Sequence, residues 1–260
     1  MEFKEKYNII PRYITPNTKR RSGTLISPSV KFIVAHDTGN TNSTADNNVS
    51  YYQRSANEIY ASAHIFVDDK EIIECVPVLT GRSEKAWHVR YSVSGDNDMF
   101  GYNANDTAIG IEYCYGSNIN SDESYKRYIW TIAYICFKFG LDPKKSIVGH
   151  HVLDPGRRSD PVNGLSKSNR TYENLLKDVV NEYSLCLINQ GENNMMRLIR
   201  NSSSKKVYAI SNDNKKHWIF NGETFRIGVE MGLWGDYNTI ELIDDDQYAE
   251  GHLIVLLNQE

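Results

Sequence analysis

Three side chains that could bind one metal ion stand at two widely separated places in the sequence. His36 follows an apolar run, and His150 and Asp160 lie ten positions apart in a segment that two prolines and a glycine stiffen, VGHHVLDPGRRSDPVN. Two imidazoles and one carboxylate fill three positions of a tetrahedral zinc ion and leave the fourth open. An open position is what a metal-dependent hydrolase needs. We therefore predict a Zn²⁺ site formed by these three residues.

The elements that must position these residues predict an α/β domain. Val30 to Ala35 is a nearly continuous apolar run, typical of a strand buried on both faces, and His36 stands at its end. Strands alternating with helices indicate a central mixed β-sheet flanked by helices. Further strands are predicted at residues 63–67 and 71–76, which form a hairpin, and at 107–115 and 145–150; helices are predicted at 44–56, 125–139 with Gly140 as C-cap, and 171–183.

The end of the chain predicts a second, smaller domain. Residues 189–194 are polar and end the helical pattern, so we expect a linker at 188–195 between a domain at 1–187 and one at 196–260. The later domain is expected to be a small all-β module with Asn221-Gly222 as a hairpin turn. Its strands are predicted at residues 206–210, 217–220, 239–243 and 252–257.

Composition excludes several classes of protein. No apolar run in the 260 residues approaches the roughly 20 that a membrane span needs, and the N-terminus carries mixed charge instead of a secretory signal, so we expect a chain made in the cytoplasm. The four scattered cysteines favour buried thiols. The net charge of −4 comes from residues 190–260, which hold 7 Lys and Arg against 11 Asp and Glu. Nucleic acid is therefore an unexpected partner.

Beyond the metal-binding pattern, residues 30–185 resemble the zinc amidase family of phage lysozyme-amidases, bacterial autolysins and animal peptidoglycan recognition proteins. Five matching pieces in the family's order are more specific than any single one. They are IVAHDTGN (33–40), SAHIFVDD (62–69), AWH (86–88), AIGIE (108–112) and GHHVLDPGRRSDP (149–161).

The resemblance assigns roles to individual residues. It makes His36, His150 and Asp160 the zinc ligands, leaving His151 as a neighbour, and it makes Glu112 the general base. It also places three residues at the substrate-binding rim of the site: Thr38, Trp87 and His88. At this rim the AWH segment could either orient a ligand histidine or contact sugar.

Two positions depart from the family pattern. Arg158 stands where the family often has lysine, and because arginine stays protonated its expected role is electrostatic support of an oxyanion. Ala63 stands where certain phage members have a catalytic tyrosine, which leaves Glu112 as the available base. The alternative to a catalytic role for Glu112 is a structural one, in which this carboxylate on a strand pairs with an arginine.

The activity that the resemblance implies is hydrolysis of the amide between N-acetylmuramic acid and L-alanine in peptidoglycan. The expected setting is a phage endolysin that is made in the cytoplasm of the infected cell and acts at the wall after release, with the C-terminal module binding a wall polymer. One alternative is a non-catalytic peptidoglycan-binding protein of the same fold, although such proteins lose a zinc ligand and none is missing here. A zinc peptidoglycan endopeptidase is the other.

Several polar and aromatic residues have structural explanations that compete with functional ones. His64 is expected to be a hydrogen-bonded core residue, and Arg157 to pair with Asp154. The acidic run 244–246 lacks the spacing of a calcium loop and predicts a solvated edge. Most aromatic residues of the C-terminal module should lie in its core, and a few exposed ones could stack on wall sugars. The six aromatic residues in question are Tyr208, Trp218, Phe220, Phe225, Trp234 and Tyr237.

Overall fold

The computed structural model describes residues 2–188, 196–201, 205–211, 214–243 and 248–254. The chain divides into two compact units, residues 3–187 and residues 188–260 together with residues 1 and 2. Short strands β1 (Glu2–Phe3) and β8 (Leu187–Ile188) pair with each other. Among the described residues no helix is both long and apolar enough to cross a membrane.

The first unit is built on a six-stranded mixed sheet, which confirms the predicted fold class. The predicted hairpin is β4 (Ile65–Val67) and β5 (Ile72–Glu74), which run antiparallel. Strand β6 (Ala108–Tyr113) lies parallel to both β3 (Phe32–Asp37) and β4, and β7 (Ile147–Gly149) lies parallel to β3. The strand order is β2 (Ile9–Pro11), β5 (Ile72–Glu74), β4 (Ile65–Val67), β6 (Ala108–Tyr113), β3 (Phe32–Asp37) and β7 (Ile147–Gly149).

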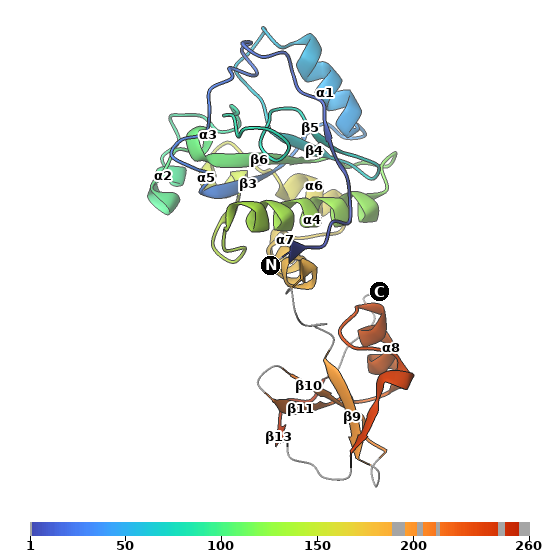
Figure 1. Ribbon diagram of the computed structural model, residues 1–260. Helices are drawn as coiled ribbons and strands as arrows, with labels where there is room; N and C mark the ends of the chain where they lie inside the picture. Colours follow the sequence, from blue (N-terminus) through green and yellow to red (C-terminus); the bar gives the residue numbers. More distant parts are fainter. Residues whose placement is uncertain (1, 189–195, 202–204, 212–213, 244–247, 255–260) are drawn as a thin grey trace. The chain divides into compact units, whose positions relative to one another are not determined.

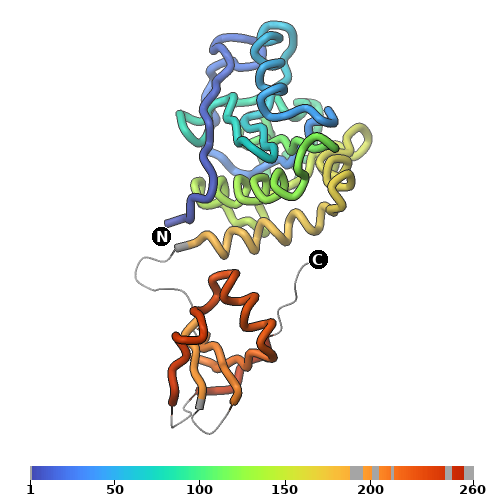
Figure 2. Tube along the Cα trace, turned by 90° about the vertical axis from the view of Figure 1, so that its right-hand side faces the viewer, coloured from blue at the N-terminus to red at the C-terminus, as the bar shows by residue number. Residues whose placement is uncertain are grey.

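Helices cover both faces of this sheet. Figure 1 shows α4 (Ser121–Phe139) and α7 (Tyr172–Cys186) on one face and α1 (Ala45–Arg54) on the other, and in Figure 2 α4 and α7 run side by side. The helix α4 is fixed at both ends: Asn120 caps its first turn, and Gly140 ends it in the left-handed region at φ 64°. The predicted glycine C-cap is therefore confirmed.

Side-chain alternation along the central strands separates packing from chemistry. The odd-numbered residues of β3 and β6, such as Ile33 and Ile111, join the main core beneath α4 and α7. The even-numbered residues point to the opposite face. There Phe32 and Val34 pack in one small cluster, while Phe66 of β4 packs in another. The last even-numbered residue of β3 is His36.

Four short helices connect the main elements. The predicted strand at 145–150 ends one residue early, because His150 starts α5 (His150–Leu153) instead of ending β7. The proline- and glycine-containing segment that follows ends in the start of α6 (Val162–Lys167). The other two, which the sequence did not predict, are α2 (Gly95–Phe100) and α3 (Ala104–Thr107).

The C-terminal unit contains a sheet, as expected, but its helix and its strand at Arg197–Asn201 were not predicted. Asn221-Gly222 is not a hairpin turn: the Asn221 side chain accepts a hydrogen bond from the Thr224 N–H and caps α8 (Gly222–Glu230). An Asn followed by Gly can also start a helix when Thr and Glu follow. The strands lie in the order β12 (Glu241–Ile243), β9 (Arg197–Asn201), β10 (Tyr208–Ile210), β11 (Lys215–Trp218) and β13 (Ala249–Glu250), and a 3₁₀ turn spans Tyr237–Thr239.

Packing in the C-terminal unit agrees only in part with the sequence predictions. The core of this unit surrounds Trp234, and Phe220 and Tyr237 are exposed. Most of the predicted linker (189–195), the acidic run (244–246) and the end of the last predicted strand (255–257) lie outside the described residues. The four cysteines are all buried and free, as expected: Cys75, Cys114, Cys136 and Cys186.

Candidate metal-dependent active site

Three neighbouring parallel strands place chemical groups at their carboxyl ends. His36 is the penultimate residue of β3, Glu112 is the penultimate residue of β6, and His150 follows the last residue of β7. In sheets of this kind ligands bind outside the carboxyl ends of the strands. The His151 N–H donates to the Asp160 carbonyl at 2.9 Å, and this bond fastens the loop that returns Asp160 to the same edge.

The two histidines and the aspartate converge on one point. One Asp160 carboxylate oxygen, Oδ2, lies 2.8 Å from Nδ1 of His36 and 3.0 Å from Nδ1 of His150. One ligand atom from each residue lies within 4.8 Å of the others, and both histidines are buried. Although burial alone would raise it, hydrogen bonds from His150 and His36 hold the pKa of Asp160 well below its ordinary value.

This donor set fits zinc. Neutral imidazole nitrogens and a carboxylate oxygen are ligands that zinc accepts, and hydrolytic zinc sites use three protein ligands. Burial, followed by the neighbouring charge of His150, lowers the pKa of His36 although Asp160 pulls it upward, so the ring is kept in the neutral form that binds metals. His36, His150 and Asp160 are therefore the residues that would hold the ion.

Glu112 lies beside this cluster as a carboxylate without a protein partner on one oxygen. It is the register partner of His36 on the adjacent parallel strand, so both side chains leave the same face of the sheet. Burial, then the negative charges of Asp160 and Asp37, raise the pKa of Glu112 well above its ordinary value, and Arg158 opposes this. A raised pKa brings a carboxylate toward the range of a general base.

His88 contacts the cluster through His36. Its Nδ1 lies 3.1 Å from Nε2 of His36, and the Asn105 side-chain oxygen accepts hydrogen bonds from the backbone N–H groups of His88 and Val89. The ring lies over Gly110, where a Cβ atom would be 2.7 Å from His88 Cγ. The glycine at position 110 therefore leaves the space that this ring occupies, whereas Asn105 carried no sequence signal.

Unpaired polar atoms gather at the same place. Among the described residues, four buried side-chain nitrogen or oxygen atoms have no hydrogen-bond partner: Trp87 Nε1, His88 Nε2, Glu112 Oε2 and His150 Nε2. An orphaned buried polar atom costs about 1–3 kcal/mol, so native proteins keep such atoms where a ligand or ion will use them. Three of the four belong to His150 of the cluster or to Glu112 and His88 beside His36, and Trp87 precedes His88 in the chain.

Two other histidines have structural roles. His64 is buried; its Nδ1 accepts from the Gly110 N–H at 3.0 Å and its Nε2 lies 2.9 Å from the Glu84 carbonyl, so the predicted core role is confirmed. His151 Nδ1 lies 3.3 Å from the Asp160 carbonyl, and its ring packs edge-on against Tyr172. His151 adjoins the cluster without contributing to it.

The remaining predicted residues lie around the cluster. Thr38 follows β3, and its N–H donates to the Tyr113 carbonyl at 3.1 Å. Arg157 pairs with Asp154, as expected. Arg158 is exposed; its charge contributes to the lowered pKa of His36 and opposes the rise in the pKa of Glu112, which places positive potential at the cluster.

Buried polar groups beneath the sheet edge hold the strand ends in place. Tyr128 of α4 donates its hydroxyl to the His36 carbonyl at 3.0 Å. The carboxylate of Asp37 accepts from the N–H groups of Gly39 and Gly164, at 2.9 and 2.8 Å. The sequence pattern placed Tyr128 in the helix core but gave no sign that its hydroxyl reaches the strand that carries His36.

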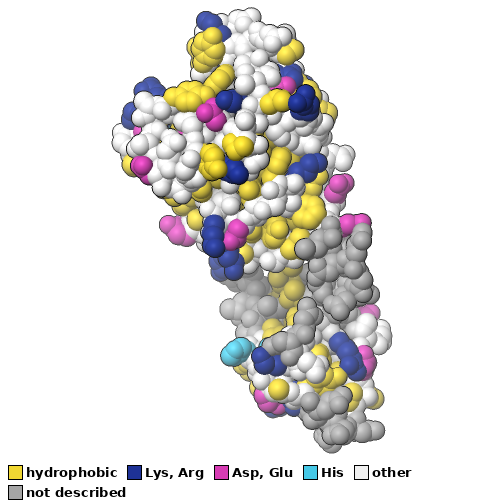
Figure 3. Space-filling view, turned by 60° about the vertical axis from the view of Figure 1, so that its left-hand side comes forward, with side chains coloured by type: hydrophobic (Ala, Val, Ile, Leu, Met, Phe, Trp, Pro, Cys, Tyr) yellow, Lys and Arg dark blue, Asp and Glu magenta, His cyan; other side chains and the backbone are white. Residues whose placement is uncertain are grey.

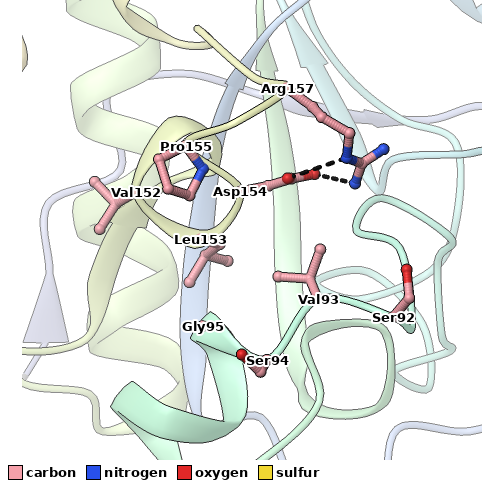
Figure 4. A pocket seen from close by; sticks show the side chains of 9 residues that line it. All are labelled: Ser92, Val93, Ser94, Gly95, Val152, Leu153, Asp154, Pro155 and Arg157. Atoms are coloured by element: carbon pink, nitrogen blue, oxygen red, sulfur yellow. Dashed lines mark hydrogen bonds and ion pairs between the residues drawn. The ribbon is translucent and has the colours of Figure 1, made fainter.

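A pocket separate from these contacts adjoins α5. Figure 4 shows it between the loop that carries Val93 and the segment from Val152 to Arg157, with the Asp154–Arg157 pair at one side. Its volume is about 410 Å³. None of the three cluster residues or Glu112 lines it.

Over the face of the first unit in Figure 3, Lys and Arg side chains alternate with Asp and Glu, with no single-sign field of the kind that binds a polyanion.

Known proteins are similar to this chain in sequence. A family model described as N-acetylmuramoyl-L-alanine amidase matches residues 27–163. The N-acetylmuramoyl-L-alanine amidase BlyA of Bacillus subtilis (strain 168) is 34% identical over 168 residues, which are 61% of this chain and 43% of BlyA. A probable N-acetylmuramoyl-L-alanine amidase of Bacillus licheniformis is 28% identical over 151 residues, 57% of this chain and 41% of that protein. The chain thus spans less than half the length of these curated relatives.

Solved structures share the fold of the first unit. The Staphylococcus aureus hydrolase AmiA, solved in complex with its ligand, is 21% identical and gives a TM-score of 0.56 over 70% of this chain and 86% of that one. The PlyG catalytic domain is 21% identical, with a TM-score of 0.51 over 68% of this chain and 95% of that one. Because the family model covers more than half of the chain, and its span includes every residue of the cluster, the chain belongs to the N-acetylmuramoyl-L-alanine amidase family.

Proposed function

We propose that this chain hydrolyses the amide bond between N-acetylmuramic acid and L-alanine in peptidoglycan, using Zn²⁺. The observation that carries the proposal is the convergence of His36, His150 and Asp160 on one point with Glu112 beside them. Membership of the amidase family supports the choice of bond. A bound zinc ion would lower the pKa of a water molecule and polarise the amide carbonyl.

The chain's own residues supply the proton transfers. Glu112 accepts a proton from the attacking water, for which its raised pKa suits it, and returns a proton to the departing alanine nitrogen. Arg158 supplies positive charge toward the oxyanion and, as an arginine, does not act as a proton donor. His88 holds the ring of His36 through the contact between Nδ1 and Nε2.

Metal removal tests the zinc dependence. We expect wall hydrolysis to stop in excess chelator and to return when zinc is added back. Magnesium added back in place of zinc serves as the control, because Mg²⁺ prefers six oxygen ligands and this cluster offers two nitrogens. Full hydrolysis in excess chelator would remove the metal from the mechanism.

The products decide between an amidase and the two alternatives. Mass spectrometry of digested wall should show free peptides that begin with L-alanine and glycan with intact muramic acid. Fragments cut within the stem peptide would identify an endopeptidase. Binding to wall without any product would identify a recognition protein, against which the complete set of three ligands and Glu112 argues.

For the C-terminal unit we propose binding to a cell-wall polymer. It has its own core around Trp234 and presents the aromatic rings of Phe220 and Tyr237 to solvent, which could stack on sugars. We expect the Phe220→Ala/Tyr237→Ala double variant to sediment less with purified walls than the unchanged chain, and the same zinc content in both. Equal sedimentation would exclude these two rings from wall binding.

The biological setting that we propose is wall lysis by a phage endolysin released from the infected cell. Zinc-dependent cutting of the muramoyl amide and a wall-binding unit together suit that task. We expect the purified chain to clear suspensions of sensitive bacteria when added from outside. Comparing walls from several bacteria would identify the chemotype that it cuts.

A further inference from the structure

Three aromatic side chains, Tyr60, Trp87 and Tyr91, form a row whose middle member immediately precedes His88 in the chain. The ring centroid of Trp87 lies 6.2 Å from that of Tyr60 on one side and 6.1 Å from that of Tyr91 on the other. Tyr60 is 70% exposed and Tyr91 is 55% exposed. Exposed aromatic side chains that stand together, instead of singly, mark a binding surface.

The row is connected to the cluster through one peptide bond. Trp87 precedes His88, whose Nδ1 lies 3.1 Å from Nε2 of His36. The same short segment of backbone therefore carries the middle ring of the row and the histidine that contacts the cluster.

Hydrogen bonds fix two members of the row, Trp87 and Tyr91. The Trp87 N–H donates to the Ser62 hydroxyl, and the Ser62 N–H donates to the Trp87 carbonyl, both at 3.0 Å. The Tyr91 hydroxyl donates to Asp106 at 2.9 Å, and Lys85 holds the same carboxylate oxygen at 2.7 Å. A surface that is fixed before binding loses little conformational entropy when a ligand arrives.

The indole N–H of Trp87 also lacks a hydrogen-bond acceptor. Its Nε1 is one of the four orphaned buried polar atoms among the described residues, and the other three belong to the cluster, Glu112 and His88. Indole N–H is a donor only, so its partner must carry an acceptor oxygen. A ligand with apolar ring faces and acceptor oxygens at their edges satisfies both the rings and this donor.

From this geometry we infer that Tyr60, Trp87 and Tyr91 form a subsite for the glycan strand of peptidoglycan, extending the proposed substrate beyond the cleaved amide. Pyranose rings present C–H faces that pack against aromatic rings, and their hydroxyl and acetamido oxygens accept hydrogen bonds. The inference rests on the proposed function only for the identity of the polymer. It makes the row a determinant of polymer recognition and leaves bond cleavage to the cluster.

Binding of a glycan that lacks the bond between muramic acid and alanine tests the row separately from catalysis. The probe is a peptide-free tetrasaccharide of alternating N-acetylglucosamine and N-acetylmuramic acid, titrated calorimetrically into the full chain. We expect the Tyr60→Ala/Tyr91→Ala double variant to bind it about tenfold more weakly. Tyr60→Phe/Tyr91→Phe is the matched control; it keeps both rings and should bind within about twofold of the unchanged chain.

Hydrolysis gives a second readout. For polymeric wall we expect the double alanine variant to show a raised KM with kcat unchanged, whereas hydrolysis of a single muramoyl dipeptide should not change. No glycan binding by the unchanged chain, or equal binding by the alanine variant, would overturn the subsite. Glycan binding that depends on the rings, without amide hydrolysis, would retain the subsite and overturn the proposed function instead.

Discussion

His36 and Glu112 are register partners on the adjacent parallel strands β3 and β6. Partners in a parallel pair point to the same face, so the sheet itself sets the spacing between the candidate ligand and the candidate base. No loop has to close to bring these two groups together. Only Asp160 depends on a loop, and that loop is fastened by the bond between the His151 N–H and the Asp160 carbonyl.

Replacing the base should separate metal binding from turnover. We expect Glu112→Gln to reduce amide hydrolysis at least about a hundredfold, because glutamine cannot accept the proton from water. Zinc content, measured by mass spectrometry of the metal, should equal that of the unchanged chain, since Glu112 is not in the ligand cluster. Glu58→Gln, at an exposed position, is the control and should keep full activity. An active Glu112→Gln chain would remove this residue from the mechanism.

Replacing the aspartate should affect the metal itself. Asp160→Asn removes the negative charge that contacts both histidines. We expect zinc affinity to fall by more than about a hundredfold, which exceeds the loss expected when a residue that only hydrogen-bonds to a metal ligand is replaced. Asp160→Cys supplies a thiolate, another zinc ligand, and should retain the ion. Competition with a chelator of known affinity measures both. Undiminished affinity in the asparagine variant would exclude Asp160 as a ligand.

Gly110 should tolerate no side chain. In Gly110→Ala the new Cβ would lie 2.7 Å from His88 Cγ, closer than real contacts allow, so the ring must move away from His36. We expect a loss of about 1–3 kcal/mol in unfolding free energy and a fall in activity measured where the variant is still folded. Gly222→Ala is the comparison, because a Cβ at that position would have no atom within 4 Å. Equal behaviour of the two variants would contradict the tight fit of His88.

Acid should destabilise the first unit in part through His64. Burial lowers the pKa of His64 from 6.5 to about 4, so between these values the unfolded chain binds a proton that the folded chain does not. Stability therefore falls as the pH drops from 6.5 toward 4, by up to about 3 kcal/mol from this residue. Denaturant titrations at several pH values should show a shallower decline in His64→Gln. The same decline in both chains would show that His64 is not responsible.

Patterns along single strands and helices predicted the strands that carry His36 and Glu112 and the strand that ends just before His150, because buried residues recur at regular intervals in the sequence. The identity of the contacts between elements left no such regularity. The side-chain amide of Asn105, which fixes the backbone at His88, and the Tyr128 hydroxyl, which reaches the His36 carbonyl, depend on distant parts of the chain meeting. The sequence resemblance suggested the ligand set, but which atoms face one another became visible only in the folded chain.

In the C-terminal unit, local chemistry was compatible with two structures. Asn221-Gly222 suits a tight turn between strands, yet the Asn221 side chain caps a helix whose Ile227 packs inward. The choice between them is made by what the following residues bury, and Trp234 lies so close to Gly228 that only a residue without a side chain fits there. A two-residue signal does not contain that information.

In the central sheet, the residues that pack in the main core and the residues of the candidate active site lie on opposite faces. This arrangement also determines which substitutions the chain tolerates. At the carboxyl ends of β3 and β6, neighbouring positions should fail in different assays: changes at Ala35 or Ile111 would lower abundance and melting temperature, whereas changes at His36 or Glu112 would leave a well-folded, inactive chain. Selection for wall clearing and selection for expression level, run on one library, would therefore divide these strands into alternating residues.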